Sequence, residues 1–158
     1  YGYLTGTYVR DKDGVDGAYM ICEMFSYYAT QGISLLDKLE ELYKTYGYCL
    51  NTLHSYEFDG SAGFARMQSI MQAFRGDIKE FGGKKVVRLL DYAPGLDGLP
   101  KSDVLKFLLE DNCSIVVRPS GTEPKLKTYL SVSAESQETA ERIEAEIRKS
   151  AEGYLRSV

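Results

Sequence analysis

The chain has 158 residues, of which 44% are hydrophobic, so it is long enough to bury the core of about one domain or a little more. Its 19 basic and 23 acidic residues give a net charge of -4, which argues against a general nucleic-acid binder, because such proteins concentrate positive charge. No run of 18 apolar residues and no leader-like segment occurs, so we expect neither a membrane span nor a signal peptide.

The cysteines and the single histidine indicate no metal site. Cys22, Cys49 and Cys113 are widely spaced and odd in number, and with His54 they form no recognisable zinc or disulfide pattern. We therefore predict no metal bound to this chain and a reducing, cytoplasmic location. His54 is expected to be a structural strand residue and not a catalytic base. The chain opens YGYLTGTY, without a methionine, and we expect it to be a piece of a longer protein.

Two consecutive helices are predicted in the first third of the chain. Apolar residues recur every three or four positions from Val15, and Gly32 is the expected stop. The second helix begins at Ser34, which forms a capping pair with Asp37, and ends at Gly47. We expect one buried apolar stripe on each helix, and tyrosines that are buried or half-buried. The stripes are Val15, Ala18, Tyr19, Cys22, Phe25 and Ala29, then Leu35, Leu39, Leu42, Tyr43 and Tyr46, and the other two tyrosines are Tyr27 and Tyr28.

From Tyr48 onward the sequence predicts strands mixed with helices. Strand-like segments cover residues 48–58, 84–92, 113–120 and 125–132, and helices are expected from 59 to about 74 and from 136 to 155. Residues 102–112 could form a short helix or a strand, and we favour the strand because a β partner follows at hairpin distance. Alternation in the last strand puts Leu126, Thr128, Leu130 and Val132 on one face, and the final helix has the stripe Ala140, Ile143, Ile147, Ala151 and Tyr154. This order indicates an α+β fold whose antiparallel sheet has its helices packed on one side.

The stretch RPSGTEPKLK, residues 118–127, gathers anion-binding groups between two predicted strands. Arg118 offers a planar guanidinium fork, and Ser120 and Thr122 add hydroxyl donors. Gly121 lets the backbone approach a ligand, so that the neighbouring amides can form an anion-holding concavity. An ordinary Ser-Gly turn with incidental charges is the alternative. The flanking strands and the two bracketing prolines, which reduce the entropy lost on binding, favour a phosphate-binding loop.

These residues resemble the phosphate-binding loop in the C-terminal domain of the α-D-phosphohexomutases, the family of phosphoglucomutases and phosphomannomutases. A second motif, YGYLTGTYVRDKDGV, resembles the segment that follows the sugar-recognising Glu-Glu-Ser loop in the family's third domain. The resemblance implies that residues 1–47 are the C-terminal helices of that third, sugar-binding domain. Residues 48–158 would then be the fourth, phosphate-binding domain, a TATA-binding-protein-like α+β module.

The resemblance also implies a reaction whose catalytic parts lie elsewhere. In the family, a phosphoserine in the first domain donates its phosphoryl group to a hexose phosphate, with a hexose 1,6-bisphosphate as intermediate and activator. Neither the family's Thr-Ala-Ser-His-Asn-Pro loop nor its Mg²⁺-binding Asp-x-Asp-x-Asp loop occurs here, and Asp11 and Asp13 are interpreted as helix-start residues. We therefore expect Mg²⁺ to bind outside this chain. The missing N-terminal domains would be its partners, and the chain alone would bind hexose phosphate without catalysis.

The resemblance assigns roles to individual residues. Four of them match the family residues that grip the non-reacting phosphate of the substrate: Arg118, Ser120, Gly121 and Thr122. Lys125 and Lys127 project from one strand face about 6 to 7 Å apart, and either adds charge beside that phosphate or is a solvated edge residue. Lys12 matches a lysine near the reacting centre of some members, where it could stabilise transferring charge or shift protons. Its alternative role is that of a helix-start residue.

Two functions from different classes stay open. The first is the phosphate-clamping portion of an enzyme that interconverts hexose 1-phosphate and 6-phosphate, with glucose as the expected sugar. The second is a free-standing anion-binding or interaction module without catalysis. We expect neither nucleic acid nor membrane as a partner, because the net charge is negative and no basic stripe is evident on a predicted sheet face.

Overall fold

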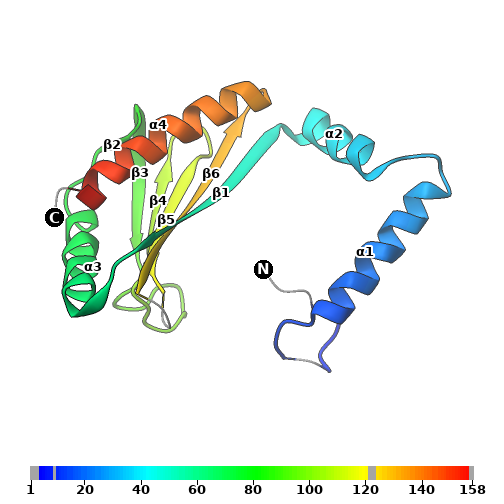
Figure 1. Cartoon of the computed structure of the whole chain (residues 1–158). Coiled ribbons are helices and arrows are strands. Elements are labelled where there is room, and N and C mark those ends of the chain that lie inside the picture. Colours follow the sequence, from blue (N-terminus) through cyan, green and yellow to red (C-terminus); the bar gives the residue numbers. More distant parts are fainter. Residues whose placement is uncertain (1–3, 9, 121–123, 157–158) are drawn as a thin grey trace. The chain divides into compact units, whose positions relative to one another are not determined.

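The computed structural model describes residues 4–8, 10–120 and 124–156, apart from the side chain of Ser61. It divides the chain between Tyr46 and Gly47 into two compact units, residues 1–46 and 47–158 (Figure 1). Within the described ranges, no helix is both long enough and apolar enough to cross a membrane.

The first unit contains helix α1 (Gly14–Ala29), which begins at a side-chain cap. The carboxylate of Asp13 accepts hydrogen bonds from the backbone N–H groups of Val15 and Asp16, each at 3.0 Å. These bonds satisfy two of the donors that a helix leaves unpaired at its start. Asp13 is therefore the helix-start residue that the sequence predicts.

Helix α2 (Leu35–Tyr46) follows, and its predicted capping pair is confirmed. The backbone N–H of Ser34 donates to the Asp37 carboxylate at 3.1 Å, and the backbone N–H of Asp37 donates to the Ser34 hydroxyl at 3.1 Å. The hydrogen bonds from Ser34 lower the pKa of Asp37. Gly47 adopts a φ of 89° after the helix, a left-handed conformation that glycine reaches without a steric penalty.

The predicted burial of the apolar stripes on these two helices is wrong for this chain. Val15 is 82% exposed, Tyr19 66% and Phe25 58%, and Gly17 alone is buried in α1. No residue of α2 is buried. An apolar helix face is buried only against a second layer of structure, and the two helices of this unit do not supply one. Four helical tyrosines were expected to be buried or half-buried. Tyr28 and Tyr43 are half-buried, whereas Tyr27 and Tyr46 are exposed.

The second unit is a six-stranded antiparallel sheet in the order β1-β6-β5-β4-β3-β2 (Figure 1). Helices α3 and α4 both cover the same face of this sheet. The predicted α+β fold is thereby confirmed, and the sequence prediction missed only the short strand β2. The elements are β1 (Tyr48–Glu57), α3 (Gly60–Phe74), β2 (Glu80–Phe81), β3 (Lys84–Asp91), β4 (Leu105–Leu109), β5 (Ser114–Pro119), β6 (Lys125–Ala134) and α4 (Gln137–Arg156).

Residues 102–112, for which the sequence allowed a helix or a strand, contain strand β4. It pairs with β5 in an antiparallel hairpin, in which Phe107 lies opposite Ile115. Asp111 and Asn112 in the connecting turn have φ values of 55° and 54°. Asp and Asn tolerate this left-handed region better than other non-glycine residues, so the turn residues fit the hairpin that they close.

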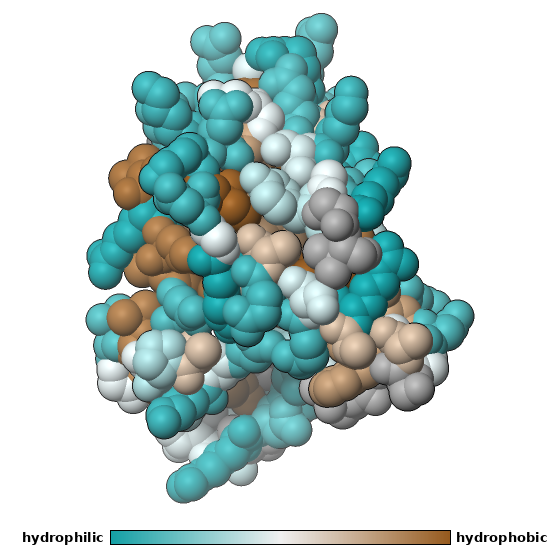
Figure 2. Space-filling view, turned by 90° about the vertical axis from the view of Figure 1, so that its left-hand side faces the viewer, coloured by the Kyte–Doolittle hydropathy of each residue, from teal (hydrophilic) through white to brown (hydrophobic). Residues whose placement is uncertain are grey.

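The core lies between the sheet and the two helices. On β6 the four residues predicted to share one face are all buried, and on α4 the predicted stripe is buried except for the half-buried Tyr154. Phe74, Phe81 and Phe107 form an aromatic cluster in this layer, with ring centroids 5.0 to 6.3 Å apart. Figure 2 shows that the outer surface on the helix side is largely hydrophilic, as expected when the apolar stripes of the helices point inward.

The turn between β2 and β3 packs closely against α4. A Cβ atom built on Gly82 would lie 2.5 Å from the carbonyl carbon of Glu146, and Gly82 has a φ of 56°. Both the contact and the conformation therefore require glycine here. This close approach places the turn between β2 and β3 directly against α4.

Candidate functional site

The predicted phosphate-binding loop joins the paired ends of β5 and β6. Pro119 lies opposite Leu126 across the two strands, and the backbone N–H of Ser120 donates to the carbonyl of Lys125 at 2.7 Å. The loop therefore begins and ends at adjacent positions of a rigid sheet. Of the predicted loop residues, Arg118 and Ser120 are described, whereas Gly121 and Thr122 lie outside the described residues.

The returning end of the loop is also anchored to β1. The backbone N–H of Phe58 donates to the carbonyl of Pro124 at 2.9 Å. Glu57 lies directly opposite Lys125, and its carboxylate is 3.1 Å from the Lys125 ammonium. Lys125 thus has an ion-pair partner of its own, and its proposed contact with a phosphate stays a prediction.

Arg118 and Lys127 form a pair of like charges directly opposite each other on β5 and β6. Residues in this relationship have Cβ atoms about 5 Å apart, and like charges placed so are destabilising. Within residues 4–8, 10–120 and 124–156, no carboxylate forms an ion pair with either side chain. An anion placed between them would remove this repulsion.

The helix-free face of the sheet carries more positive charge than the sequence indicated. Six basic residues project from it, and most lie near the end that bears the loop: Lys85, Arg88, Lys106, Arg118, Lys125 and Lys127. The expectation that no basic stripe lines a sheet face is therefore wrong. Arg88 and Lys106 were missed because the sequence of one strand does not show which residues of the neighbouring strands share its face. Only the register of β3, β4 and β5 brings them onto one face.

Lys12 belongs to the first unit, just before α1. Its ammonium lies 3.0 Å from Asp11, and the two side chains are 71% and 83% exposed. Hydrogen bonds from the Lys12 backbone and side chain lower the pKa of Asp11. Lys12 is therefore a solvent-exposed cation beside the Asp13 helix cap, and its proposed role near a reacting centre stays a prediction.

Comparison with known proteins agrees with the fold. The family described as "Phosphoglucomutase/phosphomannomutase, C-terminal domain" matches residues 60–150, which is more than half of the chain. This chain belongs to the phosphoglucomutase/phosphomannomutase family. The matched range includes β5, the loop and β6, so the site described above lies inside the family's C-terminal domain.

Relatives from bacteria extend the match to the first unit. A phosphoglucomutase of Staphylococcus aureus (strain MSSA476) is 37% identical over 160 residues, which cover 93% of this chain and 29% of the relative. A phosphoglucomutase of Staphylococcus epidermidis is 33% identical over 147 residues, covering 85% of this chain and 27% of the relative. The chain therefore spans less than a third of the length of these relatives.

A solved structure shows the same fold. It is the open form of the exocytosis-sensitive phosphoprotein pp63/parafusin from Paramecium, which is described as a phosphoglucomutase. The match has a TM-score of 0.59 at 18% identity and covers 94% of this chain and 27% of that protein. At this identity the likeness speaks for the architecture of a phosphoglucomutase domain and not for individual site residues.

The described residues of this family member do not fit a metal site. No group of three or more His, Cys, Asp or Glu side chains within those ranges is arranged to hold a metal ion. The described acidic residues nearest the loop are engaged otherwise, since Glu57 pairs with Lys125. The donor groups that the described residues offer at the loop are the guanidinium of Arg118, the hydroxyl of Ser120 and the ammonium of Lys127.

Proposed function

We propose that this chain is the substrate-phosphate-binding portion of a phosphohexomutase. The whole enzyme would be an intramolecular phosphotransferase that interconverts hexose 1-phosphate and 6-phosphate, and glucose is the proposed hexose. The observation that carries the proposal is the uncompensated pair Arg118 and Lys127 at the base of the loop. A phosphate group between two cations forms charge-assisted hydrogen bonds and removes their mutual repulsion.

In this proposal the chain binds the phosphate that does not react in a given half-cycle. Arg118 supplies a planar fork that matches two phosphate oxygens, and Lys127 supplies a point charge from the neighbouring strand. Ser120 adds a neutral donor beside them, and we assign Gly121 and Thr122 to the same cradle from the sequence motif. The ends of the loop are anchored by the hydrogen bonds of Ser120 to Lys125 and of Phe58 to Pro124, which supports a positioned anion site.

Phosphoryl transfer requires groups that we assign to the rest of the enzyme. The proposed donor serine, the Mg²⁺ ion and the sugar-recognition loop belong to other domains, with which this chain would cooperate in a soluble, cytoplasmic enzyme. The hexose 1,6-bisphosphate would be the intermediate and activator of the complete reaction.

The test of this proposal compares the chain alone with the whole enzyme. The isolated chain should show no turnover of glucose 1-phosphate, with or without Mg²⁺ and glucose 1,6-bisphosphate. In the full-length enzyme, Arg118→Ala should chiefly raise KM, because the clamped phosphate is not the one that reacts. It should also lower kcat to a smaller extent, since binding energy from a remote phosphate can drive domain closure. Turnover by the chain alone, or an unchanged KM in the variant, would contradict the proposal.

A free-standing anion-binding module is the second candidate. The same opposed cations support it, because anion binding by itself needs no other domain. The two candidates differ in one outcome. The module would bind phosphate with no activity in any assembly, whereas the mutase portion would gain activity in the full-length chain.

A further inference from the structure

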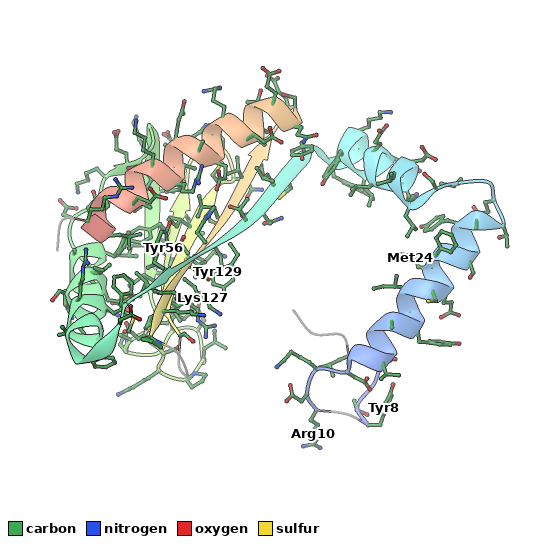
Figure 3. The ribbon with its side chains drawn as sticks, viewed as in Figure 1. Tyr8, Arg10, Met24, Tyr56, Lys127 and Tyr129 are labelled. Atoms are coloured by element: carbon green, nitrogen blue, oxygen red, sulfur yellow. The ribbon has the colours of Figure 1, made fainter. Side chains whose placement is uncertain are left out.

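Tyr129 lies on the same face of β6 as Lys127, two residues farther along the strand. Figure 3 shows both side chains on the helix-free side of the sheet, whereas Tyr56 of β1 projects toward the helices. Across the strands Tyr129 is opposite Leu53 on one side and Val116 on the other. The Tyr129 ring is half-buried between these apolar neighbours, and its hydroxyl has no hydrogen-bond partner among the residues that the structure describes.

Tyr129 lies at a distance from the Arg118 and Lys127 pair that the sugar of a bound hexose phosphate can span. Same-face neighbours on a strand are about 6.6 Å apart, so the ring of Tyr129 lies one such step from the Arg118 and Lys127 pair. A hexose phosphate holds its ring within a few covalent bonds of the phosphorus atom. A ligand whose phosphate sits between the two cations can therefore lay its sugar over Tyr129.

The surroundings of Tyr129 suit a sugar better than a second anion. Leu53 is 51% exposed beside it, and Val116 continues the apolar strip. Ligand sites commonly combine such apolar and aromatic walls with a few placed polar groups. A tyrosine ring offers a flat apolar surface at low conformational cost and a hydroxyl at its tip. Lys125, the other charged residue on this strand face, is engaged by Glu57.

Resting on the proposed function, we propose that Tyr129 is a sugar-contacting residue of the phosphate site. Its ring packs against the carbon-hydrogen face of the sugar of a hexose monophosphate, and its hydroxyl bonds to a sugar hydroxyl. The site then distinguishes a sugar phosphate from inorganic phosphate within this chain. A residue with this role contributes to substrate recognition and leaves the capture of the bare anion to Arg118 and Lys127.

The test compares two ligands on two proteins. Dissociation constants for inorganic phosphate and for glucose 6-phosphate are measured by titrating backbone amide resonances of the wild-type chain and of Tyr129→Leu. The wild type should bind glucose 6-phosphate more tightly than phosphate. Tyr129→Leu should weaken glucose 6-phosphate binding about five-fold, which corresponds to about 1 kcal/mol, and leave the phosphate constant unchanged. Tyr129→Phe should retain part of the difference, because it keeps the ring and loses the hydroxyl.

The matched control is Tyr46→Leu, the same substitution at an 81% exposed tyrosine on α2. It should change neither constant. Equal weakening of both ligands by Tyr129→Leu, or no effect on either, would overturn the sugar contact while leaving the phosphate site intact. Failure of the wild type to bind either ligand would overturn the phosphate site itself and the sugar contact with it.

Discussion

Glu144 of α4 reaches across to β1, where its carboxylate lies 2.7 Å from Nε2 of His54 and accepts a hydrogen bond from the Thr52 hydroxyl at 2.9 Å. Glu144 is only 7% exposed. A carboxylate removed from water to this extent is tolerated only when it is paired and hydrogen-bonded. The contact ties the edge strand of the sheet to the helix layer, and it gives His54 the structural role that its strand position predicts.

Replacing Glu144 with alanine should therefore destabilise the second unit. The expected loss is about 1 to 3 kcal/mol, because the half-buried hydroxyl of Thr52 and ring of His54 would lose their carboxylate partner. Urea denaturation measures the change. Glu141→Ala is the matched control, since Glu141 is an exposed carboxylate on the same helix. Equal stability of the two variants would mean that the buried contact contributes nothing.

The ion pairs of Arg75, at the end of α3, should make the stability of the second unit depend on pH. Its guanidinium donates to Asp91 at 2.9 Å and to Asp103 at 2.5 Å. The hydrogen bond from Arg75 lowers the pKa of Asp91 below its ordinary value of 3.8. The ion pair therefore stabilises the fold fully at pH values above the pKa of the unfolded carboxyl. This stabilisation is lost as the pH falls through the lower pKa that Asp91 has in the folded protein.

Arg75→Met should accordingly cost about 1 to 2 kcal/mol at neutral pH, with allowance for the partial exposure of the two carboxylates. The difference from the wild type should shrink below about pH 4, where the unfolded carboxyl begins to bind its proton. Denaturation curves at pH 7 and pH 3 measure both values. Arg142→Met is the control, because Arg142 is 64% exposed in a helical pair with Glu146. A cost that is independent of pH would refute the linkage to Asp91.

For Lys12 we predict an effect on the rate of the full-length enzyme. Lys12→Ala should lower kcat more than it raises KM, as expected of a group that acts mainly in the transition state. Steady-state kinetics with glucose 1-phosphate measure the two constants. Lys44→Ala, which removes another exposed lysine from the first unit, is the control. An unchanged kcat would leave Lys12 as a surface neighbour of Asp11.

The local sequence predicts those parts of the fold that depend on period and turn chemistry. The alternating apolar residues of β6 and the helical stripe from Ala140 to Ala151 are both buried in the core. Burial of one face requires apolar residues at the period of the strand or helix, so this spacing is visible in the sequence. The apolar stripe of α1 has the same kind of signal but is exposed. Periodicity identifies a face that can be buried, and whether a second layer covers that face depends on the rest of the structure.

Strand register is the part of the site that the sequence could not predict. The opposition of Arg118 and Lys127 follows from the pairing of β5 with β6, and a shift of one residue would turn Lys127 to the other face. The same holds for Tyr129, whose neighbours come from β1 and β5. Glu144 was missed for a related reason: on α4 it is one of many glutamates, and only the facing residues of β1 distinguish it.

Whether Arg118 and Lys127 hold a phosphate is measured by a titration of the chain with inorganic phosphate. We expect the wild type to bind with a dissociation constant of about 1 to 10 mM, since this chain would supply only part of a larger site. Arg118→Ala should weaken binding at least about ten-fold, as a charge-assisted bond contributes roughly 1.5 to 3 kcal/mol, and Lys127→Ala should weaken it less. Stability should hardly change, because Arg118 is exposed.

Arg142→Ala, which removes an exposed guanidinium from α4, controls for the loss of net charge and should bind like the wild type. Backbone amide shifts at Arg118, Ser120 and Lys127 report the binding. We expect saturable shifts in the wild type and in Arg142→Ala, and strongly reduced shifts in Arg118→Ala. Equal shifts in all variants, or none in the wild type, would show that the opposed cations bind no phosphate and that the loop is an ordinary turn.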